Sequence, residues 1–330
     1  MEQVRLGTVV FEGQSNAYLL GHSDEGPTTL IDTGPCHAGV LETLREALAK
    51  HGVNLEGIDQ VLLTHFHYDH SGLAGHIQQR SGATVCAHPD DGRLVGPDDG
   101  LDELIDSYRT STKEWGIPGE ARTELFAFLE ANADLAGRAV EITPLDPGSR
   151  VAAGADSLEV IGLPGHSLGH LGFARSDRQV FCGDALLPTY TPNIGGSDVR
   201  VEHPLGTYLE TLGSLVTSGY REAWPGHRDV IRDVAGRARE IRQHHRDRTE
   251  RVVSILASEG PLDVWQLAVR LFGDLEGIHI LHGPGEAWAH LDHLLTHDIV
   301  DNDSGAYRLI DPDPDYERIV PPLPCGPKDP

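Results

Sequence analysis

The chain has 330 residues and an apolar content of 39%, enough to bury a sizeable core in one large domain or two smaller ones. Its formal net charge is −25, and its 26 basic residues include only three lysines. So acidic a surface repels nucleic-acid backbones. Scarce lysine with abundant aspartate indicates either adaptation to high internal salt or an ordinary acidic protein from a GC-rich genome.

No apolar run approaches the length of a membrane span, and the N-terminus lacks the basic start and apolar stretch of a secretory signal. The four cysteines, Cys36, Cys86, Cys182 and Cys325, are far apart, and none forms a CxxC pair. We therefore expect no disulfide framework, no membrane association and a cytoplasmic location. Cys86 and Cys182 lie in apolar runs and are expected to be small buried residues.

The first third of the chain alternates short strands with helices. A helix is predicted over residues 39–51, where apolar residues recur at helical spacing, and another over residues 71–80. The predicted strands are short and bounded by Gly, Asn and Asp turns, and they cover residues 4–10, 17–20, 28–31, 61–63 and 84–87.

Residues 89–146 differ from what precedes them and predict a helical insertion. Residues 91–100 are rich in Gly, Asp and Pro, and helices are expected over 101–115 and 120–132. Such an insertion forms either a lid over an active site or a peripheral decoration. Sheet and helix then return, with strands at 157–161, 171–174, 179–182 and 222–224 and a helix at 207–218.

The C-terminal part has a different, local pattern. Helices are predicted at 234–258, 263–272 and 285–296, followed by a hairpin over 299–310. This order is typical of a winged-helix module. We therefore predict a catalytic domain over residues 1–235, a winged-helix-like domain over 236–310, and a flexible Pro/Asp-rich tail over 311–330.

Four separated motifs carry the chemistry. The first is His65-x-His67-x-Asp69-His70, directly after a predicted strand. Each of the others places one ligand-type side chain beside a glycine: Gly165-His166, Gly183-Asp184 and Gly226-His227. Imidazole and carboxylate groups together suit zinc, and also iron or manganese. Glycine allows the backbone to approach a crowded centre, so the pattern predicts a metal site.

With these motifs in this order, the sequence resembles the metallo-β-lactamase-fold hydrolase superfamily. Two upstream segments, Leu30-Ile31-Asp32-Thr33-Gly34 and Asn16-Ala17-Tyr18-Leu19-Leu20, match it as well, and the resemblance covers about residues 1–235. It implies an α/β fold, an αββα sandwich. Within the superfamily the chain is most similar to the glyoxalase II-like and lactamase-beta-2-like group, whose latter members carry a winged-helix-like C-terminal domain.

The resemblance implies a dinuclear site with two zinc ions, iron or manganese being alternatives. His65, His67 and His166 would bind the first ion, Asp69, His70 and His227 the second, and Asp184 both. A metal-bridging hydroxide would act as nucleophile beside the catalytic carboxylates Asp69 and Asp184. Asp32 resembles the family's carboxylate that orients the histidine loop from behind the ligands.

Three functions of different kinds follow. A thioester or other acyl substrate is the preferred hypothesis, because a helical lid suits a bulky acyl group. The alternative is an endoribonuclease or phosphodiesterase of the lactamase-beta-2-like type, although residues 236–330 carry a net charge of −7. A non-enzymatic regulator is the third, and the complete ligand set argues against it. The sequence leaves the oligomeric state open, a homo-oligomer included.

Other charged residues are ambiguous. His170 is either a support for the metal ligands or a packing residue, and His88 is expected to be structural. His290, His293 and His297 share a helix face and are interpreted as solvated or packing residues rather than a metal patch. The arginines of residues 234–258 form either a basic stripe or a solvated face paired with Glu240, Asp247 and Glu250.

Overall fold

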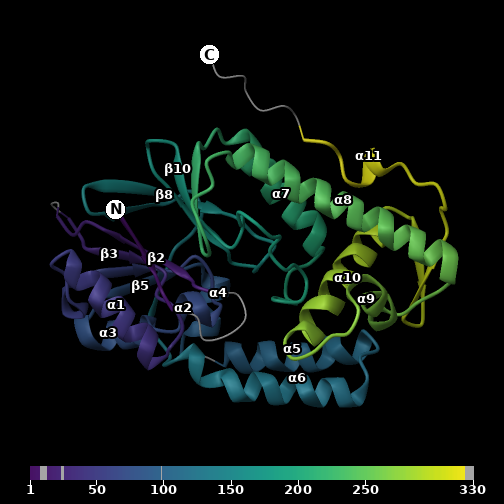
Figure 1. Cartoon of the computed structure of the whole chain (residues 1–330), viewed down its shortest axis with the longest axis horizontal. Coiled ribbons are helices and arrows are strands. Elements are labelled where there is room, and N and C mark those ends of the chain that lie inside the picture. The colour runs from purple at the N-terminus through teal and green to yellow at the C-terminus, as the bar shows by residue number, and fades with distance from the viewer. Residues whose placement is uncertain (8–12, 24–25, 98, 324–330) are drawn as a thin grey trace. The chain divides into compact units, whose positions relative to one another are not determined.

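The computed structural model describes residues 1–7, 13–23, 26–97 and 99–323, which form two compact units (Figure 1). Unit 1 contains the described residues among 1–101, 132–192 and 220–234. Unit 2 contains those among 102–131, 193–219 and the chain from 235 on. Each unit therefore draws on three separate stretches of sequence.

The first sheet of unit 1 has six strands in chain order: β1 (Glu2–Arg5), β2 (Asn16–Leu20), β3 (Thr29–Ile31), β4 (Gln60–Leu62), β5 (Thr84–Ala87) and β6 (Ile142–Pro144). β1 to β3 pair antiparallel, and β3 to β6 pair parallel. Helices α1 (Ala38–Lys50) and α3 (Ala74–Ser81) bury Leu44 and Ile77 in one core with Val61 and Val85. These helices therefore cover one face of this sheet.

The second sheet of unit 1 has five strands in the order β11 (Glu222–Pro225), β10 (Gln179–Gly183), β9 (Leu171–Ala174), β8 (Asp156–Gly162) and β7 (Arg150–Ala153). Only the pair β10 and β11 is parallel. Ile31 and Leu62 of the first sheet share a buried core with Leu158, Phe173 and Phe181 of the second. The two sheets therefore pack face to face as a sandwich.

Parallel pairing brings polar residues to a common edge of each sheet. Asp32 follows β3, His65 follows β4 and Asp91 follows β5, and these three strands run parallel. In the second sheet Asp184 follows β10 and His227 follows its parallel neighbour β11. Loops at the carboxyl ends of parallel strands are where α/β proteins place functional groups.

The insertion begins with a helix that the composition of residues 91–100 did not predict. Helix α4 (Pro89–Val95) is capped by the preceding His88, whose Nδ1 accepts the Asp90 N–H at 3.2 Å. Proline in the first turn and aspartates beside it stabilise a helix N-terminus, although they resemble loop composition. The following helices, α5 (Gly100–Glu114) and α6 (Gly119–Asn132), agree with the prediction.

Two more predicted boundaries differ from the structure. The helix expected over residues 71–80 is two helices, α2 (Tyr68–Ser71) and α3, separated at Gly72. A Cβ on Gly72 would lie 2.3 Å from the Leu135 carbonyl oxygen, so only glycine fits there. The strand expected over residues 4–10 corresponds to β1, which ends at Arg5. Residues 8–10 of the expected strand lie outside the described part of the chain.

Unit 2 is helical, with one hairpin. After α5 and α6 come α7 (Pro204–Thr217), α8 (Val234–Glu259), α9 (Val264–Phe272), α10 (His279–Thr296), the strands β12 (Val300–Asp303) and β13 (Ala306–Leu309), and α11 (Tyr316–Ile319). The order of three helices and a hairpin agrees with the sequence, and the winged-helix assignment stays a prediction. Helix α10 begins before Pro284 rather than after it, so Pro284 lies inside the helix, where it lacks the N–H that would donate to the Ile280 carbonyl.

Within unit 2, the helices of the insertion pack against the C-terminal helices. The Trp265 N–H donates to the Trp115 carbonyl at 2.9 Å, and the Gly277 N–H donates to Glu124 Oε1 at 2.9 Å. Ile319 of the predicted tail is 1% exposed. The lid function and the domain boundaries stay predictions. Among the described residues, no helix is both long and apolar enough to cross a membrane.

Candidate metal centre

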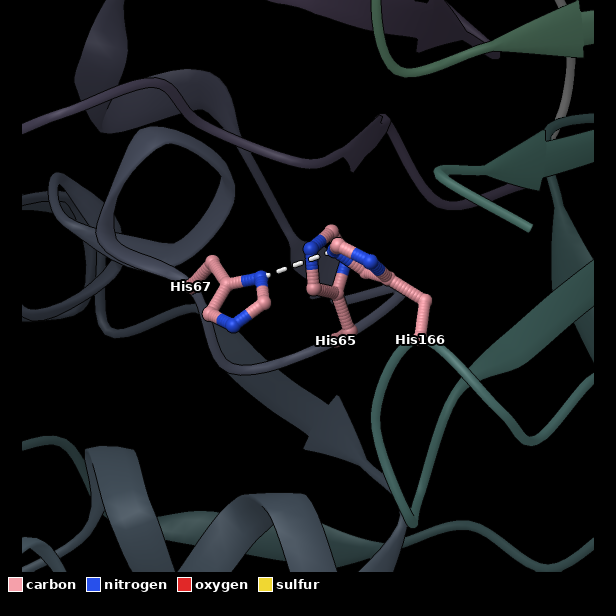
Figure 2. A group of neighbouring side chains, drawn as sticks. All are labelled: His65, His67 and His166. Atoms are coloured by element: carbon pink, nitrogen blue, oxygen red, sulfur yellow. Dashed lines mark hydrogen bonds between the residues drawn. The ribbon is translucent and has the colours of Figure 1, made fainter. Parts of the chain in front are cut away.

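Three histidines from two separate loops meet in unit 1. His65 and His67 lie in the loop after β4, and His166 lies in the loop between β8 and β9 (Figure 2). His67 Nδ1 lies 3.0 Å from His166 Nε2, and the His65 ring lies 4.7 Å from the His67 ring. One nitrogen from each histidine falls within 4.8 Å of the others, so the three imidazoles converge on a common point.

A second group of side chains converges beside the first. His227 Nε2 lies 3.3 Å from Asp69 Oδ2, and His70 Nε2 lies 3.6 Å from the same oxygen. The Asp184 carboxylate lies between both groups, 3.3 Å from His227 Nε2 and 3.9 Å from His166 Nε2. The structure thus brings together all seven ligand-type side chains of the motifs: His65, His67, Asp69, His70, His166, Asp184 and His227.

Glycine is required where the loops meet. An added Cβ on Gly226 would lie 2.1 Å from Asp184 Oδ1 and 2.5 Å from His70 Cε1. Gly183 has a φ of +48°, and a Cβ there would lie 2.7 Å from Thr64 Oγ1. The prediction that glycine allows close backbone approach is confirmed at both positions.

Asp32 is buried behind the histidines and organises their loop. Its carboxylate accepts the Thr64 N–H and hydroxyl, each at 2.8 Å, and lies 2.9 Å from His70 Nδ1. Because a carboxylate only accepts, His70 Nδ1 carries the proton and its Nε2 presents a lone pair to the centre. Thr64 Oγ1 also lies 3.0 Å from His65 Nδ1 and fixes that ring in the same tautomer.

The metal-facing atoms of the centre are buried and have no hydrogen-bond partner in the part of the chain that the structure describes. This holds for the Nε2 atoms of His65, His70 and His227, and for Asp184 Oδ1. His227 Nδ1 lies 3.1 Å from the Gln14 carbonyl oxygen, which leaves its Nε2 as the lone-pair atom. Buried polar atoms normally find a partner. Converging lone pairs without partners fit a bound cation, so the donor set present here suits metal ions.

The electrostatics of the centre favour cations. Burial alone would raise the pKa of Asp184, but His227 and His70 hold it well below its usual value. Burial alone would lower the pKa of His227, but Asp184 and Asp69 raise it to about 10. The buried carboxylates thus favour positive charge nearby. Without a metal ion, that charge comes from protons bound to the neighbouring histidines. Metal binding would displace those protons.

Residues outside the predicted ligand set also shape the centre. His170 Nε2 accepts the Asp184 N–H at 3.1 Å, and its ring stacks on His65 at 4.8 Å, which makes it a support for two ligands. Burial lowers the pKa of His170 to about 3, so its ring stays neutral and can accept. Asn16 Nδ2 and Tyr18 Oη donate to the Pro225 carbonyl, two residues before His227.

The carboxylate of Asp91 was not predicted to take part. It is 1% exposed and contacts both histidine loops through hydrogen bonds to Phe66, Ser167 and Gly169. Asp91 lies at the start of the segment 91–100, which is rich in Gly, Asp and Pro and for which no helix was predicted. A buried first-turn aspartate of a helix carries no distinct local pattern, and its partners lie 25 to 78 positions away.

Comparison with known proteins agrees with this fold. A family model described as the metallo-beta-lactamase superfamily matches residues 10–227. The chain therefore belongs to the metallo-beta-lactamase superfamily, as a metallo-hydrolase with a mixed α/β sandwich. The fold class expected from the sequence is thereby confirmed, whereas the C-terminal winged helix is not tested.

Individual relatives cover most of the chain. Probable metallo-hydrolase YqjP of Bacillus subtilis is 28% identical over 82% of this chain and 86% of its own length. Hydroxyacylglutathione hydrolase GloC of Haemophilus influenzae is 28% identical over 62% of this chain and 78% of its own. The chain spans 57 to 61% of the length of several fungal lactamase-like proteins.

The same architecture occurs in a solved structure. The metallo-beta-lactamase family protein TTHA1429 of Thermus thermophilus superposes with a TM-score of 0.80 at 26% identity. The match covers 93% of this chain and 98% of that one. The similarity thus extends beyond the sheets of unit 1 and includes most of the residues of unit 2.

Proposed function

We propose that unit 1 binds two metal ions, preferentially zinc, and hydrolyses a thioester or another acyl substrate. The first ion would be held by His65, His67 and His166, the second by Asp69, His70 and His227, and both by Asp184. The observation that best supports this proposal is the convergence of the buried Nε2 atoms of His65, His70 and His227 with Asp184 Oδ1, none of which has a hydrogen-bond partner among the described residues. An imidazole-rich donor set is typical of zinc, and iron or manganese fit it too.

The chain's own residues prepare the centre for hydrolysis. Bound ions would supply Lewis-acid activation of a water molecule and of the substrate's carbonyl oxygen. Asp69 and Asp184 have pKa values held well below the usual range by His70 and His227, although burial opposes this. Both carboxylates therefore stay ionised at neutral pH and can orient the attacking water. Asp32 and Thr64 keep the histidine loop in its ligand geometry.

The acyl preference rests on relationship and on charge. GloC is a hydroxyacylglutathione hydrolase, and a hydroxyacylglutathione is a thioester. Residues 236–330 carry a net charge of −7, whereas nucleic-acid binding normally needs a basic face. A small acyl or thioester substrate is therefore favoured over RNA.

Ion pairs made by the arginines of α8 weaken the RNA alternative further. Arg237 Nη1 lies 3.0 Å from Glu240, Arg246 Nε lies 3.2 Å from Glu250, and Arg248 Nη1 lies 2.5 Å from Glu286. Arg242 is 9% exposed and donates to two backbone carbonyls. These arginines are engaged within unit 2, which supports a paired helix face over a basic stripe. The Arg237, Arg246 and Arg248 side chains are only 16%, 25% and 17% exposed, so this part of the face is not the solvated one that the sequence suggested.

Metal analysis tests the site. We expect about two ions per chain in the purified protein, with zinc restoring them after chelation. A folded protein that takes up no ion would contradict the ligand assignment. The cytoplasmic location, a homo-oligomeric state and a winged helix in unit 2 stay predictions that this measurement does not touch.

A substrate panel tests the reaction class. Thioesters, lactones, a phosphodiester and short single-stranded RNA are assayed with and without chelator, in low salt and in molar KCl. We expect thioester hydrolysis that stops with chelator and returns with zinc. Metal-dependent RNA cleavage as the dominant activity would replace the acyl proposal by the endoribonuclease alternative.

A further inference from the structure

The two loops that supply the His65, His67 and His166 group share a buried carboxylate outside the ligand set. Asp91 lies in the first turn of α4 and is 1% exposed. Its Oδ2 accepts the Phe66 N–H at 3.3 Å and the Ser167 hydroxyl at 2.6 Å. Its Oδ1 accepts the Gly169 N–H at 2.8 Å.

The partners of Asp91 are placed next to the metal-ligand candidates. Phe66 stands between His65 and His67, and Ser167 follows His166 directly. Figure 2 shows the loops of these histidines approaching from different parts of unit 1. The hydrogen bonds to Asp91 therefore help to set the distance between the two loops.

The packing around Asp91 allows little adjustment. A Cβ on Gly169 would lie 2.8 Å from both Asp91 Oδ1 and His88 Nδ1, so the loop approaches α4 closely only because that residue is glycine. Ser167 is fully buried. A carboxylate that accepts three hydrogen bonds in such a site cannot be exchanged for an amide without confronting one N–H with another.

We propose that Asp91 is a positioning residue for the first metal pocket, tying the His65–His67 loop to the His166 loop as Asp32 orients His70 of the second pocket. This inference rests on the proposed dinuclear site and extends it to a residue that does not touch the ions. Groups that orient metal ligands in this way change metal affinity by roughly 10- to 100-fold when they are removed.

The experiment compares Asp91→Asn with Asp90→Asn, the same substitution one position earlier, where the side chain is 49% exposed. Metal content and affinity are measured by competition with a chelator, and ligand geometry by the visible spectrum of the cobalt-substituted protein. We expect Asp91→Asn to bind one of two ions roughly 10- to 100-fold more weakly and to shift the cobalt bands. Asp90→Asn should match the wild type in both.

A second variant protects the test against misfolding. Ser167→Ala removes one donor to Asp91 and keeps the loop's backbone bond from Gly169, so it should fold and show a smaller change in the same direction. Asp32→Asn serves as the comparison variant: it should weaken the second ion through His70 and also affect the first through Thr64 and His65. Unchanged affinity and cobalt spectrum in both Asp91→Asn and Ser167→Ala would overturn the positioning role alone. A wild type without metal would overturn the proposed function, and this inference with it.

Discussion

Two clusters of buried histidines, one in each unit, differ in the charge around them. In unit 1, the rings of His70 and His227 face the carboxylates Asp69 and Asp184. In unit 2, His245 Nδ1 lies 3.4 Å from His290 Nε2, and the neighbouring carboxylate Glu286 is engaged by Arg248. Carboxylates outnumber fixed cations in the first cluster, and an arginine neutralises the carboxylate in the second.

The surrounding charge moves the histidine pKa values in opposite directions. Asp69 and Asp184 overcome burial and hold the pKa of His70 well above its usual value. Burial, reinforced by neighbouring histidines and by Arg248, holds the pKa values of His245 and His290 well below theirs. His245, Glu286 and His290 offer ligand atoms within 4.8 Å of one another. A metal ion there would nevertheless add a second cation beside Arg248 with one carboxylate to balance both, so we expect no ion in unit 2.

The largest expected difference between the two clusters is in catalysis, and it should appear when the carboxylate of each cluster, Asp184 or Glu286, is replaced by an amide. Asp184→Asn is expected to lower kcat/KM by about 10³-fold or more, since residues that act as one catalytic unit fail together. Glu286→Gln should leave kcat/KM of the metal-loaded enzyme nearly unchanged, because it removes no group of the first cluster. Steady-state kinetics with the best thioester of the panel measures both. Comparable losses in the two variants would contradict the division of roles.

Removing the arginine from the second cluster tests the charge argument directly. Arg248→Ala leaves Glu286 buried without its ion-pair partner and should lower the free energy of unfolding by about 3 kcal/mol. Zinc should then restore part of that stability, because the histidines and Glu286 have lost the competing cation. Chemical denaturation with and without zinc measures this. Arg246→Ala is the control, since Glu250 is 44% exposed and the pair contributes about 0.5 kcal/mol or less.

Replacing a histidine should lower the metal content of the protein only when that histidine belongs to the first cluster. His227→Gln is expected to weaken one of the two ions by about 100-fold or more, beyond the effect of residues that only orient ligands. His290→Gln should keep both ions, because its ring is bonded to Thr249 and His245. Metal analysis after dialysis against a weak chelator distinguishes the variants. A third ion in the wild type that disappears in His290→Gln would refute the comparison.

The sequence predicted the ligand-bearing motifs because each stands in a short local pattern at a strand end. Asp184 and His227 could be predicted in the same way, because each directly follows a glycine at a strand end. The structure shows why a glycine is needed before His227: a Cβ on Gly226 would collide with the Asp184 carboxylate. Helix α4 and Asp91 escaped prediction because proline and aspartate at a helix start have the composition of a loop. The contacts of Asp91 join residues far apart in sequence, and only the folded sandwich brings them together.

The contacts among the histidines of unit 2 were less predictable from the sequence than the ligand residues of unit 1. His290 and His293 share a helix, yet His290 bonds to Thr249 whereas His293 Nε2 donates to the Ile319 carbonyl at 2.7 Å. His245, which pairs with His290, comes from α8 and showed no spacing that linked it to α10. Which histidines meet depends on how α8 and α10 pack, which periodicity within either helix does not determine.

The last expected effect is the pH dependence of stability that the second cluster contributes. The pKa values of His245 and His290 are near 6.5 in the unfolded chain and well below it in the folded protein. Between these values the unfolded state binds more protons, so stability falls as the pH drops below about 6.5. Each histidine should contribute a slope of about 1.4 kcal/mol per pH unit.

Tryptophan fluorescence can isolate this effect. Trp115, Trp265 and Trp288 belong to unit 2, and Trp224→Phe removes the remaining tryptophan, which lies in unit 1. Urea unfolding of the chelated protein at pH 7.5, 6.5 and 5.5 is compared with that of a variant that adds His245→Gln and His290→Gln. The histidines of the first cluster titrate identically in both proteins, so the difference in slope belongs to the second cluster. Equal slopes would mean that His245 and His290 bind protons equally well in the folded and unfolded states, and the contrast in charge between the clusters would be lost.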